Sequence, residues 1–149
     1  MGGRAYIDSN VIIYIIEGEG SLKTLAGSAL ERLIREERVL VTSELTVGEC
    51  LAGALRRDRG LAEAYLDLFD VTGLLEIADV TRPLVRRAAA LGAELNMKLL
   101  DVLHVATVEA LGCKVLLTND RGIRAPAGIE LRHLQEETAA YSPPPSEWT

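Results

Sequence analysis

The sequence has no long apolar run, which excludes an integral membrane protein built on helices. No uninterrupted stretch of apolar residues approaches the roughly 20 that a membrane-spanning helix needs. The first residues carry only Arg4 before the apolar "AYI" and lack the apolar region of a signal peptide. We therefore expect a soluble, cytoplasmic protein without membrane contacts.

Cysteine and histidine are also scarce, which excludes the common zinc and disulfide frameworks. Cys50 and Cys113 lie far apart within apolar segments, as reduced core cysteines do. The two histidines, His104 and His133, leave a zinc site short of ligands. We expect His104 to be a hydrogen-bonded core histidine.

Positive charge is in deficit as well. The chain has 16 basic and 22 acidic residues, a formal net charge of -6, whereas proteins that bind nucleic acid usually carry a basic surplus. This balance argues against unspecific adhesion to a polyanion. Any contact with nucleic acid has to be made by a local patch of basic side chains.

What the sequence does contain is enough apolar material for one domain. With 149 residues, 48% of them hydrophobic, and no internal repeat, the chain can bury a single core. The composition changes only near the end, where the three consecutive prolines in "YSPPPSEWT" forbid a helix. We predict one domain over residues 1–134 and an extended tail over residues 135–149.

Short β-rich runs alternate with helical patterns along the domain. This alternation is typical of an α/β fold, in which helices cover both faces of a parallel sheet. The predicted strands are 4–8, 38–42, 74–78, 114–118 and 129–134. The predicted helices are 9–18, 21–37, 43–57, 61–69, 81–95 and 99–113.

Two acidic residues stand at the ends of predicted strands. Asp8 ends the first strand, and Asp120 follows the strand that ends in Thr118. In open parallel sheets, ligands bind outside the carboxyl ends of the strands, where the strand order reverses, so both carboxylates are candidates for a functional site. Each also has an ordinary structural role open to it, Asp8 as a helix N-cap and Asp120 as a turn residue.

Two further acidic residues lie on predicted helices. Glu49 falls on a helix that Ser43 can cap, and its uncharged neighbours set it apart from Glu44, which is expected to face solvent. Asp101 lies near the start of a helix that is apolar nearly all round and therefore buried. Taken alone, Asp101 is explained as well by a structural role, in capping or in complementing the helix dipole, as by a functional one.

These four carboxylates would repel one another at one end of a sheet unless a cation lay among them. A set of oxygen ligands with few nitrogen or sulfur donors suits Mg²⁺ or Mn²⁺. Such a centre favours attack of water on a phosphodiester, with the metal activating the nucleophile and stabilising the leaving oxygen.

Four segments of the chain resemble the motifs of a known family. They are "YIDSNVIIYIIEG", "VTSELTVGECLAG", "LLDVLHVATVEALG" and "VLLTND". In this order and spacing they look like the motifs of the PIN domain family of ribonucleases, most closely the small single-domain toxins of the VapBC type. The resemblance implies a three-layer α/β/α sandwich around a parallel sheet, and a divalent-metal-dependent endoribonuclease that cleaves RNA.

The resemblance also assigns residues of the site. Carried over position by position, the catalytic and metal-binding carboxylates are Asp8, Glu49, Asp101 and Asp120. Asn10 and Thr118 would then hold water at the metal or orient the first carboxylate.

Basic residues close to the acidic ones are predicted to bind the RNA phosphates. Arg56 and Arg57 follow the helix of the second motif, and Arg121 and Arg124 follow the last motif. Arginine runs are also common on solvated helix faces, so this assignment depends on where the structure places them.

Toxins of this type are similar to one another in being silenced by an antitoxin, which the resemblance therefore implies as a partner. The apolar runs "VIIYII" and "LAGSALERLI" exceed what one core face requires. Exposed apolar surface of that kind marks contacts with other proteins. We therefore expect a cognate antitoxin and a homodimer.

Two other functions remain open on the sequence alone. A haloacid-dehalogenase-like phosphatase also uses a strand-end Asp, but it requires a second Asp two residues later, where this chain has Asn10. A non-catalytic PIN-like module that binds RNA or protein would be favoured by the loss of an acidic position, and none is lost here.

Overall fold

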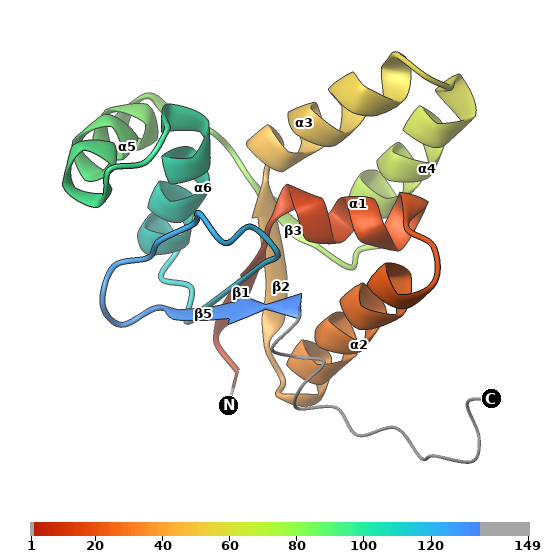
Figure 1. Ribbon diagram of the computed structural model, residues 1–149, viewed down its shortest axis with the longest axis horizontal. Helices are drawn as coiled ribbons and strands as arrows, with labels where there is room; N and C mark the ends of the chain where they lie inside the picture. The colour runs from red at the N-terminus through yellow and green to blue at the C-terminus, as the bar shows by residue number, and fades with distance from the viewer. Residues whose placement is uncertain (1, 135–149) are drawn as a thin grey trace.

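The computed structural model describes residues 2–134, and the predicted tail over residues 135–149 lies outside this range. Strands and helices alternate along the described chain (Figure 1). The strands are β1 (Arg4–Ile7), β2 (Val39–Ser43), β3 (Glu76–Ala78), β4 (Val115–Thr118) and β5 (Glu130–His133). The helices are α1 (Ser9–Glu17), α2 (Ser21–Arg35), α3 (Glu44–Leu55), α4 (Arg59–Asp70), α5 (Arg82–Leu95) and α6 (Leu99–Ala110). Every predicted element is present.

The five strands form one parallel sheet in the order β3-β2-β1-β4-β5. β1 lies in the middle, where Ala5 pairs with Leu40 of β2 on one side and with Val115 of β4 on the other. From β1 the chain first builds outward through β2 and β3, and then returns to the opposite side of β1 with β4. The strand order therefore reverses between β1 and β4, which is where ligands bind in such sheets.

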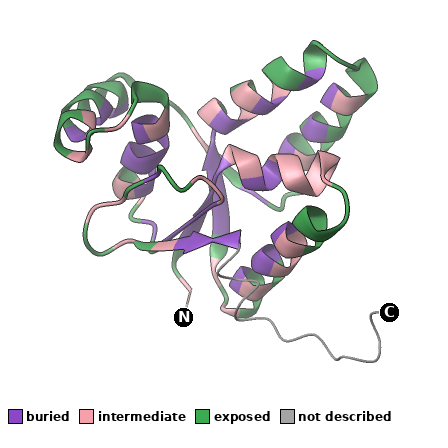
Figure 2. Ribbon diagram, viewed as in Figure 1, coloured by how far each residue is buried: buried purple, intermediate pink, exposed green. Residues whose placement is uncertain are grey.

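Helices cover both faces of the sheet (Figure 1). Helices α1 to α4 pack on one face, and α5 and α6 pack on the other. Along β1, Ala5 and Ile7 belong to the first core, and Tyr6 between them belongs to the second, because successive side chains of a strand point to opposite faces. Figure 2 shows the central strands β1, β2 and β4 mostly buried between the two helical layers, whereas β3 at the edge of the sheet is not. The fold is the predicted three-layer α/β/α sandwich.

The turn between α5 and α6 brings the start of α6 to the carboxyl edge of the sheet. The side chain of Thr81 caps α5 by accepting from the backbone N–H of Leu84, as a threonine in that position does. Asn96 ends α5 in the left-handed conformation, with φ 54°, and this lets the chain reverse direction.

Within residues 2–134, no helix is both long enough and apolar enough to cross a membrane.

Helix α6 is buried along most of its length, as its composition predicts. Residues 102–108 are all buried between the sheet and α5. The prediction is wrong for the first turn, however, where Leu99 and Leu100 are 51% and 57% exposed. This turn lies at the carboxyl edge of the sheet, beyond the strands on which the rest of the helix packs.

Candidate active site

Asp8 and Asp120 both lie at the carboxyl edge of the sheet, next to the reversal of strand order. Asp8 follows β1 and is 4% exposed, and the backbone N–H of Asp8 donates to the carbonyl of Leu117 in β4. Asp120 follows β4 and is half-buried. Both residues also have the structural roles considered for them, as a helix N-cap and as a turn residue. Asp8 caps α1, and Asp120 accepts from the N–H of Gly122 at 2.8 Å in a turn.

The Asp8 carboxylate is held by donors on both oxygens. Oδ1 accepts from the backbone N–H of Ser9 at 2.8 Å. Oδ2 accepts from the hydroxyl of Thr118 at 2.7 Å and from the side-chain amide of Asn10 at 3.2 Å. These contacts fix the orientation of the carboxylate, whereas a role for Asn10 and Thr118 at a metal ion stays a prediction.

Thr118 is the residue that links the two strand ends. Its hydroxyl donates to Asp8 and accepts from the Asn10 amide at 3.2 Å and from the N–H of Asp120 at 3.0 Å. The carbonyl oxygen of the Asn10 side chain in turn accepts from the N–H of Asn119 at 2.9 Å. All of the hydrogen-bonding capacity of the buried Thr118 hydroxyl is thereby used within the site.

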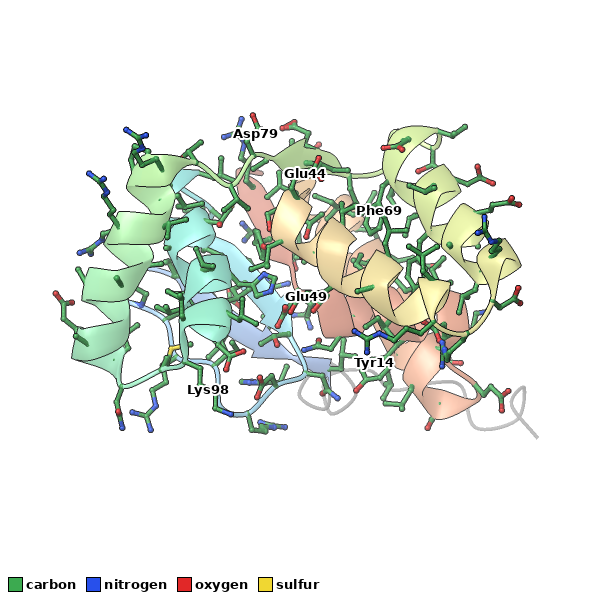
Figure 3. The ribbon with its side chains drawn as sticks, turned by 90° about the horizontal axis from the view of Figure 1, so that it is seen from above. Tyr14, Glu44, Glu49, Phe69, Asp79 and Lys98 are labelled. Carbon is green, nitrogen blue, oxygen red and sulfur yellow. The ribbon has the colours of Figure 1, made fainter. Side chains whose placement is uncertain are left out.

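Glu49 reaches the site from α3. Its side chain is 34% exposed, and Oε1 lies 2.8 Å from Nε2 of His104 on α6. The same nitrogen is 3.6 Å from Oδ1 of Asp8, so the two carboxylates meet at one imidazole. Figure 3 shows Glu49 on the part of α3 that lies beside α6, whereas Glu44 stands at the exposed start of α3. Glu44 is exposed, as predicted, and Glu49 is half-buried, whereas the catalytic role of Glu49 stays a prediction.

Asp101 enters the site from the first turn of α6, where it is half-buried. Burial raises the pKa of Asp101, and the negative charges of Asp120 and Asp8 raise it further, whereas the charges of His104 and Lys98 act in the opposite direction. The net pKa is raised. Asp101 therefore lies close enough to Asp8 and Asp120 to feel their charges, and the structure brings all four predicted carboxylates to one place.

Few positive charges neutralise this cluster directly. In residues 2–134, Asp8, Asp101 and Asp120 form no ion pair with a lysine or arginine. Within the same range, no three His, Cys, Asp or Glu side chains are grouped closely enough to surround a metal ion. The donor set, which is almost entirely oxygen, still fits a hard divalent cation. Holding one would draw the carboxylates closer together than they lie here.

A buried tyrosine beneath the site was missed by the sequence reasoning. Oη of Tyr6 lies 2.7 Å from Nδ1 of His104 and 2.8 Å from the hydroxyl of Ser43. Ser43 therefore occupies the N-cap position of α3 without capping it through its side chain, which corrects the prediction. The signal for this contact was a tyrosine two residues before Asp8 on a buried strand, since a buried phenol needs hydrogen-bond partners.

Both rings of this pair have perturbed pKa values. Burial raises the pKa of Tyr6 well above its usual value, and the hydrogen bond with Ser43 offsets this only in part, so the phenol stays protonated. Burial lowers the pKa of His104, but the hydrogen bond with Glu49 and the charges of the nearby carboxylates outweigh it, so the net pKa is raised. His104 is the hydrogen-bonded core histidine that the sequence predicts, and it also belongs to the site.

The predicted RNA-binding arginines are not equivalent. Arg56, Arg121 and Arg124 are exposed, and Arg124 makes a long hydrogen bond of 3.4 Å to the carbonyl of Leu95. Arg57 is paired with Glu17 at the end of α1. A cation that the prediction did not include is Lys98 at the N-terminus of α6 (Figure 3), whose charge acts on Asp101.

A sequence model of the PIN domain matches residues 5–129, a range that contains all four carboxylates. The chain belongs to the PIN domain family. This excludes the haloacid-dehalogenase-like alternative, and the structure places Asn10 as a hydrogen-bond donor to Asp8 where that alternative requires a second acid. No curated protein matches the sequence.

Several solved structures share the fold. The structure of VapBC2 from Rickettsia felis, bound to a DNA fragment from its promoter, aligns with a TM-score of 0.68 and 19% identity, over 87% of this chain and 97% of that chain. A toxin–antitoxin complex from Klebsiella pneumoniae aligns with a TM-score of 0.67 and 21% identity, over 84% and 94%. VapC20 of Mycobacterium tuberculosis, a toxin that cleaves the sarcin–ricin loop, aligns with a TM-score of 0.66 and 19% identity, over 86% and 98%.

Proposed function

We propose that this PIN domain is a divalent-metal-dependent endoribonuclease. The observation that carries the proposal is that Asp8, Glu49, Asp101 and Asp120 lie around the reversal of strand order. Within residues 2–134, no arginine or lysine forms an ion pair with the three aspartates. Clustered carboxylates of this kind favour a bound cation. We expect Mg²⁺ or Mn²⁺, because the ligands available are oxygens.

The four carboxylates are the residues that would hold this cation. When bound, such a cation lowers the pKa of a water molecule and neutralises charge that develops on a phosphodiester. The protein contributes orientation: Asn10 and Thr118 hold the Asp8 carboxylate from one side. The turn that begins at Asp120 is tied to the same threonine through its backbone N–H.

The RNA would be bound by exposed basic residues around the site. We assign this role to Arg121 and Arg124, which follow Asp120, and to Arg56 after α3. Arg57 would have to give up its ion pair with Glu17 before it could bind a phosphate. We therefore expect its replacement to affect RNA binding less than that of the exposed Arg56.

Cleavage of a mixed RNA pool by purified protein tests the catalytic proposal. Reactions in Mg²⁺, in Mn²⁺ and in chelator are compared for the wild type, Asp8→Asn and Glu49→Gln, with Glu44→Gln on the exposed start of α3 as the matched control. We expect metal-dependent internal cuts by the wild type and the control alone. If folded wild-type protein makes no cuts in either metal, a non-catalytic PIN-like binding module becomes the better explanation.

We further propose that the protein is the toxin of a toxin–antitoxin pair. Structures that share its fold include a toxin–antitoxin complex from Klebsiella pneumoniae and VapBC2 from Rickettsia felis. On α1, Ile13, Tyr14, Ile15 and Ile16 are only partly buried, which leaves apolar surface for a partner segment. Expression of the chain alone should arrest growth of a bacterial host, and expression of Asp101→Asn should not. Normal growth with active wild-type protein would refute the toxin assignment.

The same reasoning supports a homodimer. The exposed Leu99 and Leu100 at the start of α6 are side chains that a second copy could cover. Sedimentation of the purified protein should give the mass of two chains, and Leu100→Asp should shift the mass toward that of one chain. A wild-type monomer at micromolar concentration would contradict the dimer.

A further inference from the structure

His104 is a buried residue that lies beside two carboxylates of the site, Glu49 and Asp8, and the function proposed above gives it no role. It is 3% exposed, and both of its ring nitrogens have protein partners. Nε2 contacts Glu49 at 2.8 Å, and Nδ1 contacts the hydroxyl of Tyr6 at 2.7 Å. A single imidazole therefore connects the sheet to the one site carboxylate that comes from α3.

The partners of the neutral imidazole fix which nitrogen carries the hydrogen. A carboxylate can only accept hydrogen bonds, so Nε2 of His104 has to donate to Glu49. Nδ1 is then an acceptor, and the hydroxyl of Tyr6 is the donor it needs. Tyr6 can in turn accept from the hydroxyl of Ser43 at 2.8 Å. Each side chain in this series, from Glu49 through His104 and Tyr6 to Ser43, therefore has a hydrogen-bond partner.

The contact with Glu49 is the same when the imidazole is positively charged. Both nitrogens of His104 then donate, so Nδ1 donates to Tyr6, and Tyr6 turns its hydroxyl hydrogen toward Ser43. Nε2 continues to donate to Glu49. The hydroxyls of Tyr6 and Ser43 can rotate, and the network therefore holds Glu49 in either charge state of His104.

Only one of the two carboxylate oxygens of Glu49 is held by a hydrogen bond within the described residues. Oε1 accepts from His104, whereas Oε2 makes no hydrogen bond to any residue within 2–134. The side chain is 34% exposed, and glutamate has several rotatable bonds. Without His104 it would be drawn toward solvent and away from Asp8, because the two carboxylates repel each other.

We propose that His104 is a positioning residue, which holds Glu49 beside Asp8 so that its second oxygen is available to a divalent cation. The proposal deepens the proposed nuclease function and rests on it. The alternative is that His104 only fills the core beneath the site. In that case its replacement would alter stability without a specific effect on metal binding.

Binding of Mn²⁺ to the purified protein without RNA, measured by calorimetry, distinguishes these roles. His104→Asn keeps a polar group next to Tyr6 but is too short to reach Glu49, whereas His104→Gln is one methylene longer and can donate from a position close to Nε2. We expect the Mn²⁺ affinity of His104→Asn to be about 10-fold weaker or more, as is typical when a residue that supports a metal ligand is lost. His104→Gln should recover most of the wild-type affinity.

Thr107→Val is the matched control, because Thr107 is buried on the same helix and, within residues 2–134, its hydroxyl bonds only to the carbonyl of Leu103. It should bind Mn²⁺ as the wild type does. In a Glu49→Gln background, His104→Asn should cause no further loss, since the two residues act through one contact. Thermal melts of all variants show which of them are folded.

The outcomes separate this inference from the proposed function. If the wild type binds Mn²⁺, Glu49→Gln weakens the binding and folded His104→Asn does not, the positioning role is wrong and the nuclease proposal stands. Equal weakening by the Asn and Gln variants also overturns the positioning role. A wild type that binds no Mn²⁺ and cuts no RNA overturns the proposed function, and the inference with it.

Discussion

Replacing Thr118 by valine removes one hydroxyl from the centre of the site and leaves the shape of the side chain unchanged. The hydroxyl is fully buried, donates to Asp8 at 2.7 Å and accepts from Asn10 and from the N–H of Asp120. Asn10 keeps its own bond to Asp8, and the Asp120 N–H is only partly buried. The bond to the charged carboxylate therefore accounts for most of the loss.

A hydrogen bond to a charged group contributes about 1.5–3 kcal/mol, and the partly buried N–H of Asp120, which loses its acceptor, adds up to about 1 kcal/mol. We expect Thr118→Val to lower the free energy of unfolding by about 2–4 kcal/mol. For a chain of this size, that corresponds to a fall in Tm of roughly 5–15 °C. RNA cleavage should fall as well, because Asp8 would lose a donor that orients it.

Urea and thermal unfolding followed by circular dichroism, in chelator, measure this loss. Thr118→Ser is the control, because it keeps the hydroxyl and deletes only a buried methyl group, at a cost of about 1 kcal/mol. The reasoning requires the valine variant to be less stable than the serine variant. A valine variant as stable as the serine variant would refute the view that Thr118 holds Asp8 through its hydroxyl.

Three further predictions follow from charges on the structure. Burial and the neighbouring carboxylates raise the pKa of Asp101, so ionisation of this residue opposes folding. Asp101→Asn should therefore have a higher Tm than the wild type at pH 7 in chelator. The difference in Tm should shrink as the pH falls toward about 4, where the aspartate becomes protonated. Burial would raise the pKa of Glu36, but hydrogen bonds from two arginines lower it to about 2. The ionised Glu36 therefore stabilises the fold, and the difference in unfolding free energy between the wild type and Glu36→Gln measures this effect. The effect should be complete above pH 4.5 and lost between pH 4.5 and about 2. Replacing Arg121 and Arg124 by alanine should weaken RNA binding and reduce its salt dependence. For single strands, the slope of log K against log salt should fall by up to about 0.7 per arginine. An unchanged slope would contradict the assignment of these arginines to the RNA phosphates.

The fold could be predicted because the sequence pattern is local and consistent. The run "RAYID" followed by "SNVIIYII" reads as a buried strand and a helix, and it forms β1 and α1 with Asp8 between them. Once the strands are parallel, the carboxyl ends of β1 and β4 meet at one edge, so Asp8 and Asp120 come together by geometry. The position of both residues therefore follows from the order of elements.

The contacts within the site could not be predicted because they depend on distances between elements. Nothing local indicates that Nε2 of His104 would reach Glu49 across the gap between α6 and α3. Nor does the sequence indicate that Ser43 would bond to Tyr6 in place of the helix that follows. Side-chain contacts of this kind are decided by packing, which places α3 and α6 on opposite faces of the sheet and leaves their ends side by side.

The central claim is that this carboxylate site hydrolyses RNA with a divalent cation. The most direct measurement is digestion of total bacterial RNA in Mg²⁺ or in chelator, by the wild type and by Asp101→Asn, with the chemistry of the new ends determined. Attack by water leaves no cyclic phosphate, whereas attack by the ribose 2′-hydroxyl does. We predict internal cuts without 2′,3′-cyclic phosphate that require Mg²⁺ and are absent from the variant. Cuts that persist in chelator, or that carry cyclic phosphate ends, would contradict the account.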